Sequence, residues 1–297
     1  MIAHKLSPAA AFGVAATGIA VFSAMDAVMK GLTLAIGVYN AMLWRSVAGV
    51  AIAGVLWVAL DRRLPTRAAL RLHLMRGAVG AVMALLFFWG LARIPIAQAI
   101  TLAFVAPLIA LFLAAVVLGE RIGRETIVAS AIAFLGVSTV LVGQARTGSG
   151  GEAFWGTLAV LASAVCYAVN IILMRLQSQL AGPLEVAFWQ TGMVTLVLLL
   201  GAPWFIAPPP GGQLPAIVLG AALATISLLL LAWAYAHGEA SYLAPTEYTA
   251  FIWAALFGWT VFGEPLSPWT LAGAVLIIAG CLIAARRRPV PLAEPIA

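Results

Sequence analysis

The residues best suited to bind a charged small molecule are ionisable side chains inside long apolar stretches. Asp26 and Glu247 are carboxylates of this kind, and Lys30 follows Asp26 by four residues, which places both on one helix face. A charged group near the centre of a bilayer costs about 2.5 to 3.5 kcal/mol on insertion scales, so it should face a partner or a wet cavity. A carboxylate on a cavity wall can hold an ammonium group or accept a proton.

Glu247 is the strongest candidate, because it lies inside an apolar span two residues after Pro245. The alternative is that its carboxylate makes an internal hydrogen bond to a Tyr or Trp and only stabilises packing. Further aromatic and polar residues complete the candidate substrate-binding set, although aromatic stripes more often form a core or an interfacial belt. These residues are Tyr248, Trp89, Trp233, Trp253, Thr101 and Asn170.

Asp26 has two interpretations, and the sequence leaves both open. It forms an ion pair with Lys30 at the outer end of its helix, or it faces a pathway that Glu247 faces from the second half of the chain. In the second case Asn170, near the position that repeats Asp26, is a neutral partner.

Other charged residues near span ends have simpler expected roles. Arg45, His73 and Arg76 are expected to extend to the lipid headgroups. His237 and Glu239, at the predicted cytoplasmic end of an apolar span, form a candidate gate, and a solvated turn explains this pair equally well.

The composition requires a membrane environment for these groups. Of the 297 residues, 64% are apolar and 9% are charged, with a mean hydropathy of +1.09, which no soluble domain tolerates on its surface. A spanning helix needs about 20 apolar residues. Stretches of this length begin near positions 9, 38, 71, 96, 124, 153, 184, 214, 240 and 269.

The net charge of +6 sets the orientation in the membrane. Most of the basic residues fall in short connections on one side, so the positive-inside rule places both termini in the cytoplasm and a nucleic-acid partner is not expected. Cys166 and Cys281 lie inside apolar spans, where they act as small packing residues.

The sequence lacks the motifs that common classes of enzyme require. The chain contains no G-x-x-x-x-G-K-[ST] loop and no H-E-x-x-H sequence, and its cysteines and histidines form no cluster. We therefore expect no cofactor, no metal site, no ATP hydrolysis and no enzymatic activity.

The second half of the chain repeats the first at an offset of 144 residues, and of 145 in its earlier part. Trp89 matches Trp233, and Met29-Lys30 matches Met174-Arg175. Each half holds five predicted spans, and two copies of a unit with an odd number of spans must be inverted across a bilayer. The predicted units are residues 1–144 and 153–288, joined by a linker at 145–152 and followed by a tail at 289–297.

Matched pairs also predict structural roles. Glu120 and Glu264, each at the end of a span, are expected to serve the N-terminus of the next helix. Gly136 and Gly280 each follow a small residue by seven positions, which favours close helix packing within the scaffold or a homodimer contact.

Two long segments carry a family resemblance. FVAPLIALFLAAVVLGERIGRETIVASAIAFLGVSTVLVG and EYTAFIWAALFGWTVFGEPLSPWTLAGAVLIIAGCLIAA resemble the drug/metabolite transporter superfamily, in particular its EamA-type members. WGLARIPIAQAITLAF and LAPTEYTAFIWAALFGW are most similar to amino-acid exporters of the YddG type.

The resemblance implies an all-α membrane protein with ten transmembrane helices in two inverted five-helix repeats around a central cavity. It implies a secondary transporter in a bacterial inner membrane that exports aromatic and other neutral amino acids by alternating access. The alternatives are a carrier of sugars, drugs or other neutral metabolites on the same scaffold, and a membrane scaffold that transports nothing.

Overall fold

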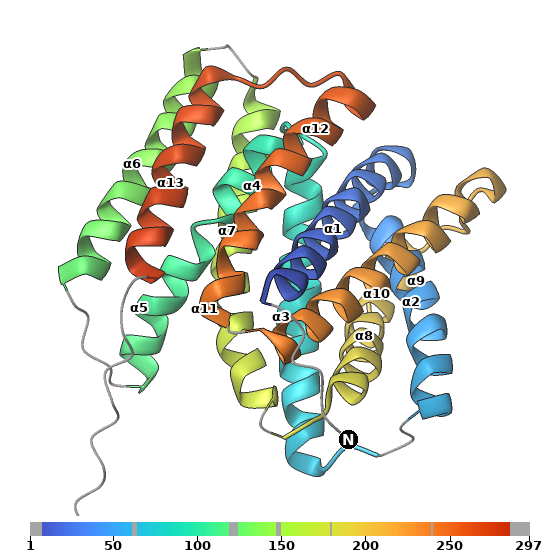
Figure 1. The fold of residues 1–297 in the computed structure, drawn as a ribbon. Helices are drawn as coiled ribbons and strands as arrows, with labels where there is room; N and C mark the ends of the chain where they lie inside the picture. The colour runs from blue at the N-terminus through green and yellow to red at the C-terminus, as the bar shows by residue number, and fades with distance from the viewer. Residues whose placement is uncertain are drawn as a thin grey trace, which may run out of the picture.

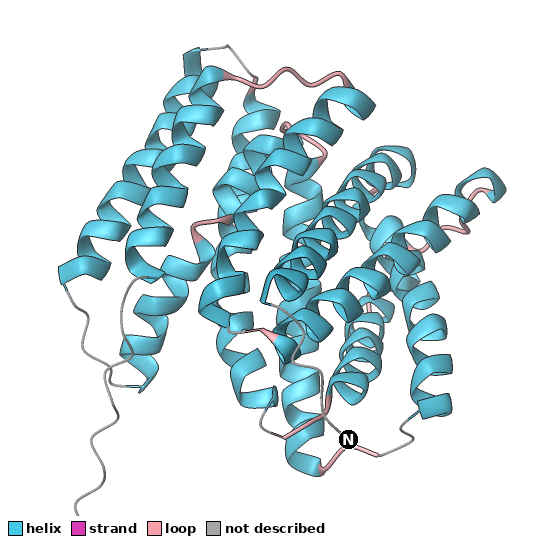
Figure 2. Cartoon of the chain, in the orientation of Figure 1, coloured by secondary structure: helices cyan, strands magenta, loops and turns pink. Residues whose placement is uncertain are grey.

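The computed structural model describes residues 8–60, 64–118, 124–146, 150–178, 180–238 and 240–285, and every regular element in these ranges is a helix (Figure 2). The first half contains α1 (Pro8–Ile36), α2 (Val38–Leu60), α3 (Arg67–Leu91), α4 (Ile96–Ala103), α5 (Ala106–Leu118) and α6 (Arg124–Arg146). The second half contains α7 (Gly151–Ser178), α8 (Pro183–Leu199), α9 (Ala202–Phe205), the 3-10 turn η1 (Gly211–Gln213), α10 (Leu214–His237), α11 (Ala240–Leu243), η2 (Ala244–Thr249), α12 (Ala250–Phe262) and α13 (Pro268–Ala285).

Seven helical stretches of the described chain are long and apolar enough to cross a membrane, and the shorter apolar helices Leu184–Leu199 and Pro268–Ile283 accompany them. Each apolar stretch expected from the sequence begins within a few residues of an observed helix start. The expectation of an all-helical, multi-pass membrane protein is therefore confirmed.

One span of each half is broken within its length. α4 ends at Ala103 and α5 starts at Ala106, while α11 passes through the 3-10 turn η2, which contains Pro245, before α12 begins. A proline ring clashes with the carbonyl four residues earlier, and for Pro107 that residue is Ala103. The first-half break therefore lies at Phe104–Val105, between α4 and α5.

α6 and α13 lie side by side at one edge of the bundle (Figure 1). A Cβ added to Gly280 would lie 2.6 Å from the Ala129 carbonyl, and one added to Gly136 would lie 2.8 Å from the carbonyl of Gly273. These glycines therefore allow close packing within one chain, which is one of the two roles expected from the sequence. Because α6 and α13 cover these faces for each other, the glycines are not available for a homodimer contact.

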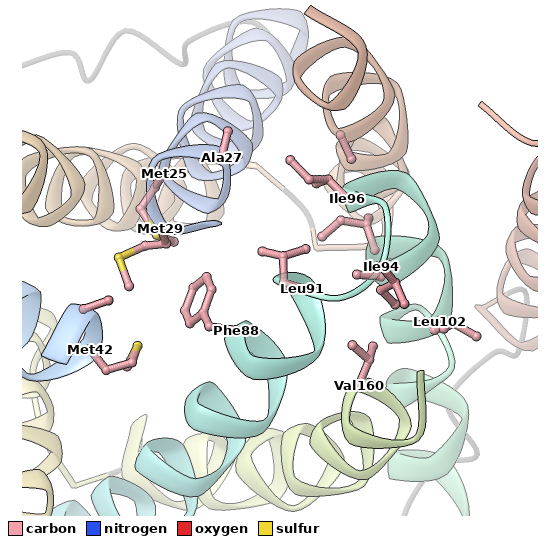
Figure 3. Packing of buried hydrophobic residues seen from close by; sticks show 14 of the residues in the cluster. Met25, Ala27, Met29, Met42, Phe88, Leu91, Ile94, Ile96, Leu102 and Val160 are labelled. Carbon is pink, nitrogen blue, oxygen red and sulfur yellow. The ribbon is translucent and has the colours of Figure 1, made fainter. Parts of the chain in front are cut away.

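The apolar core lies where helices of both halves meet (Figure 3). Met29, Met42, Phe88, Leu91 and Val160, from α1, α2, α3 and α7, are all buried there. α1 also packs against α10, whose Ser227 hydroxyl donates to the Gly18 carbonyl at 2.9 Å. This packing joins α1 of the first half to α10 of the second half.

Candidate functional site

The 3-10 turn η2 places Glu247 at the protein surface, where its carboxylate remains accessible. Its Oε1 accepts a hydrogen bond of 2.9 Å from the Tyr235 hydroxyl near the end of α10. The internal hydrogen bond expected as the alternative is thus present. Because the partner is neutral and Glu247 is exposed, however, the carboxylate remains accessible to a ligand.

One further tyrosine lies close to this pair and connects it to an arginine. Tyr167 of α7 is 42% exposed and interacts electrostatically with both Glu247 and Arg76, and also with Tyr235. We call Arg76, Tyr167, Tyr235 and Glu247 the Glu247 cluster. Because Arg76 comes from α3 and the other three from the second half, the cluster joins the two halves and holds an acid and a base.

Arg76 is held by neutral groups. Its Nε donates to Asn170 Oδ1 at 2.8 Å, and its Nη1 donates to Gln177 Oε1. Within the described ranges, no carboxylate lies at ion-pairing distance from Arg76. Its positive charge is therefore not neutralised by direct contact.

The polar contacts around Arg76 continue into the protein. Gln177 Nε2 and His73 Nδ1 lie 2.6 Å apart, and His73 Nε2 lies 3.2 Å from Glu185 of α8. His73 and Gln177 are fully buried. The expectation that His73 and Arg76 extend to lipid headgroups is wrong, because α7 and α8 cover the face of α3 on which they lie.

Asp26 does not pair with Lys30. Its side chain is 1% exposed, and neither carboxylate oxygen has a hydrogen-bond partner. Arg45 is close enough to interact with it electrostatically, and the Arg45 Nε is likewise buried without a partner. Since its side chain is enclosed, Asp26 does not face the accessible Glu247 cluster, whereas Arg45 is only half-buried.

Lys30 pairs instead with Glu264, which follows the last residues of α12. Lys30 Nζ donates to Glu264 Oε1 and to the Ile94 carbonyl at 2.8 Å. Glu264 Oε2 accepts a hydrogen bond of 2.8 Å from the amide of Ile96, and Ile96 is the first residue of α4. We call this contact set the upper closure, since the turn from α12 to α13 lies at the top of Figure 1.

Glu264 therefore serves the N-terminus of α4 and not that of α13, the next helix. Gly263 adopts φ +65°, which ends α12, and the Glu264 amide bonds back to the Gly258 carbonyl at 2.9 Å. This turn directs the carboxylate toward α1 and α4. Glu264 was expected to cap the helix that follows it and instead caps α4. In both cases a carboxylate lies at the positive end of a helix.

The aromatic candidates divide between two regions. Tyr248 follows Glu247 and packs edge-on against Phe104, with 5.4 Å between ring centroids. Trp89 lies 13 residues beyond Arg76 along α3, or about 20 Å at 1.5 Å per residue, so it is remote from the Glu247 cluster. It carries the Arg93 guanidinium 3.5 Å above its ring and lines an apolar pocket of about 660 Å³ with Tyr39 and Trp155.

The remaining candidates make local contacts. Trp233 stacks on His237 at 4.4 Å, and the His237 ring nitrogen lies 2.8 Å from the Trp233 carbonyl. Trp253 stacks on Phe257, and buried Thr101 donates to the Ala97 carbonyl. Thr101 thus has no accessible surface for a ligand. Glu120 and Glu239 lie outside the described residues.

Sequence reasoning missed three members of the Glu247 cluster as ligand-binding residues: Arg76, Tyr167 and Tyr235. A signal for Tyr167 was present, since it lies three residues before the candidate Asn170 on one helix face. Arg76 had no such signal, because its role depends on which helices cover α3.

Comparison with known proteins identifies the family. The EamA-like transporter family matches residues 10–142 and 154–286. The "Pseudopaline exporter CntI" of Pseudomonas aeruginosa is 26% identical over 90% of this chain and 93% of its own length. A "Probable terminal-alkyne amino-acid exporter" of Streptantibioticus cattleyicolor is 32% identical over 89% of each chain.

Two further matches are informative. A "Riboflavin transporter" of Rhizobium johnstonii is 28% identical over 72% of this chain and 70% of its own length. One solved structure, described only as "Crystal structure of protein", is 22% identical, covers 95% of this chain and 100% of its own, and has a TM-score of 0.59. This last similarity shows a shared fold. The predicted resemblance to EamA-type proteins is confirmed.

Proposed function

Because the chain belongs to the EamA-like transporter family, we propose that it is a secondary transporter that exports small zwitterionic metabolites, with aromatic and other neutral amino acids as the first class. The proposed architecture is ten spans in two inverted repeats, residues 1–144 and 153–288, with the linker 145–152 and the tail 289–297. Both termini are cytoplasmic, and the membrane is a bacterial inner membrane. The relative named as an amino-acid exporter supports this substrate class.

The Glu247 cluster is the observation that carries the proposal. A free neutral amino acid has an ammonium and a carboxylate a few ångströms apart, and the cluster has the complementary charges on Glu247 and Arg76 with Tyr167 interacting with both. The ammonium binds Glu247. The carboxylate binds Arg76, which uses two of its five N–H donors on Asn170 and Gln177.

The backbone amides that follow Pro95 could also bind a carboxylate, but they are already used. The Ile96 amide donates to Glu264 in the upper closure. Arg76 therefore replaces it, and charge-assisted hydrogen bonds of a guanidinium to a carboxylate are among the strong ones in proteins.

The aromatic rings of the cluster favour aromatic side chains. Tyr167, Tyr235 and Tyr248 surround the carboxylate from three elements, and a flat ring packs well against such groups. A second candidate function, transport of an uncharged ring system, draws on the same rings and on the relative named as a riboflavin transporter. For that function Glu247 is dispensable.

Proteoliposomes containing the purified protein test the proposal directly. We expect saturable uptake of labelled phenylalanine, tryptophan and threonine, which Glu247→Gln lowers by about tenfold or more, because one charged contact is lost. Glu152→Gln is the matched control, since Glu152 is exposed and pairs with Arg93 away from the cluster. A Glu247→Gln protein that transports at the parental rate contradicts amino-acid binding at this site and favours the uncharged substrate.

A further inference from the structure

We propose that Asp26, beside Arg45, is a proton-binding site that couples transport to a pH gradient. One proton adds to a carboxylate oxygen of Asp26 in one state of the cycle and leaves to water in the other, with no other bond changed. The inference rests on the proposed transport function and adds a coupling ion to it.

The surroundings of Asp26 favour the protonated form in the observed state. The side chain is 1% exposed, and no donor reaches either of its oxygens. An ionised carboxylate that loses water without gaining hydrogen bonds is strongly unfavourable, whereas the neutral acid avoids most of this penalty. The conformation therefore matches a carboxyl group that holds its proton.

Arg45 can stabilise the ionised form of Asp26, which is the alternative state. It lies on α2, its Nε is buried without a partner, and it packs toward α10 beside Gly220, whose added Cβ would lie 3.8 Å from Arg45 Cδ. Loss of the proton turns Asp26 into an anion next to this cation. A direct ion pair then draws α1 and α2 together, in a place where both face the second half.

Other charges do not compete for Asp26. Lys30 on the same helix pairs with Glu264. On α10, Gly220 lies beside Val28 and Met29 at the level of Asp26, so the titratable residues Tyr235 and His237 begin 15 residues farther along, about 22 Å away at 1.5 Å per residue. α12 has no titratable residue. On α3, His73 and Arg76 contact Glu185, Gln177 and Asn170. Tyr242 of α11 packs on Phe12, and Glu247 of η2 accepts from Tyr235. Arg45 is the charged neighbour of Asp26.

The position of Asp26 links its proton to the movement of the halves. α1 packs against α10 and α12 of the second half, and Lys30 of the upper closure follows Asp26 by one helical turn. A change in the charge of Asp26 therefore alters the same helix that holds the upper closure shut. This arrangement is what a coupling site requires, because the bound proton must favour one orientation of the halves.

The first test needs no substrate. Infrared difference spectra of the full-length protein in lipid nanodiscs, recorded between acidic and alkaline buffer, should contain a protonated-carboxyl band. We expect Asp26→Asn to remove one component of that band, and Glu152→Gln to keep this component. A band of unchanged intensity in Asp26→Asn protein overturns the proposal, whatever the substrate.

The second test measures coupling in proteoliposomes. Each unit of pH gradient supports about tenfold accumulation per coupled proton, so wild-type protein should accumulate phenylalanine about tenfold when a one-unit gradient is imposed. Asp26→Asn should keep exchange of labelled for unlabelled phenylalanine without a gradient and lose the gradient-driven accumulation. Asp26→Glu should regain it, which shows that the effect is not misfolding.

The outcomes separate the two proposals. Gradient-driven accumulation by Asp26→Asn protein overturns the coupling role. A wild-type protein that moves no amino acid contradicts the proposed function, and the infrared band then still decides whether Asp26 binds a proton.

Discussion

The upper closure and the Glu247 cluster each bring an acid and a base from different halves together, and they differ in how the charges meet. In the upper closure, Lys30 and Glu264 are in direct contact and Glu264 also accepts the Ile96 amide. In the Glu247 cluster, the acid and the base bond only neutral groups, with Tyr167 close to both. Direct contact satisfies the charges and locks two segments together, whereas separated charges remain able to bind a ligand.

Breaking the upper closure has the largest expected effect. Lys30→Ala leaves the Glu264 carboxylate without its cation, and loss of one partner of a buried ion pair costs about 3 to 5 kcal/mol. Thermal unfolding of the purified protein should show a clearly lower midpoint. Arg93→Ala, which breaks the more exposed Arg93–Glu152 pair, should cost about 1 kcal/mol or less. Equal midpoints for the two variants contradict the structural role assigned to Lys30.

Neutralising the Glu247 cluster should affect ligand binding and leave stability nearly unchanged. Hydrogen bonds to charged groups contribute about 1.5 to 3 kcal/mol, so Glu247→Gln should weaken phenylalanine binding by about 10- to 100-fold. The glutamine oxygen still accepts from Tyr235, so the unfolding midpoint stays close to wild type. Isothermal titration calorimetry and thermal unfolding of the same sample check both statements. A large loss of stability with unchanged affinity would reverse the comparison.

A substitution between α6 and α13 tests stability separately, because these two helices supply no residue of the upper closure or of the Glu247 cluster. The Cβ of Gly280→Ala meets the Ala129 carbonyl, so the helices must separate, at a cost of about 1 to 3 kcal/mol. Gly13→Ala has no atom within 4 Å to meet and is the matched control. Unfolding midpoints should fall for the first variant alone, and phenylalanine affinity should stay constant for both.

The smallest expected effect comes from Tyr235→Phe. It removes one neutral hydrogen bond of 2.9 Å, for which the net contribution is about 0.5 to 1.5 kcal/mol. We expect phenylalanine binding to weaken by about 2- to 10-fold, because the Glu247 carboxylate loses the donor that orients it. Competition binding with labelled phenylalanine measures this. A loss as large as that of Glu247→Gln would mean that Tyr235 contacts the ligand itself.

Several features of the fold could be predicted from local patterns. Helix starts follow from apolar length, and the close packing at Gly136 and Gly280 follows from small residues at helical spacing. The partner of Glu264 could not be predicted, since α4 precedes it by more than 150 residues. Arg76 was likewise missed, because a basic residue near a span end has the same local pattern whether lipid or α7 covers it.

By itself, the sequence determined that the chain crosses a membrane as helices and that its two halves repeat, because hydropathy and a constant offset are properties of the chain alone. It also determined which residues are ionisable within apolar spans. Only the tertiary structure decided how these charges are distributed: Lys30 with Glu264, Asp26 beside Arg45, and Glu247 and Arg76 each near Tyr167. The physical reason is that electrostatic and hydrogen-bond energies depend on separation and burial, which packing sets between segments far apart in sequence.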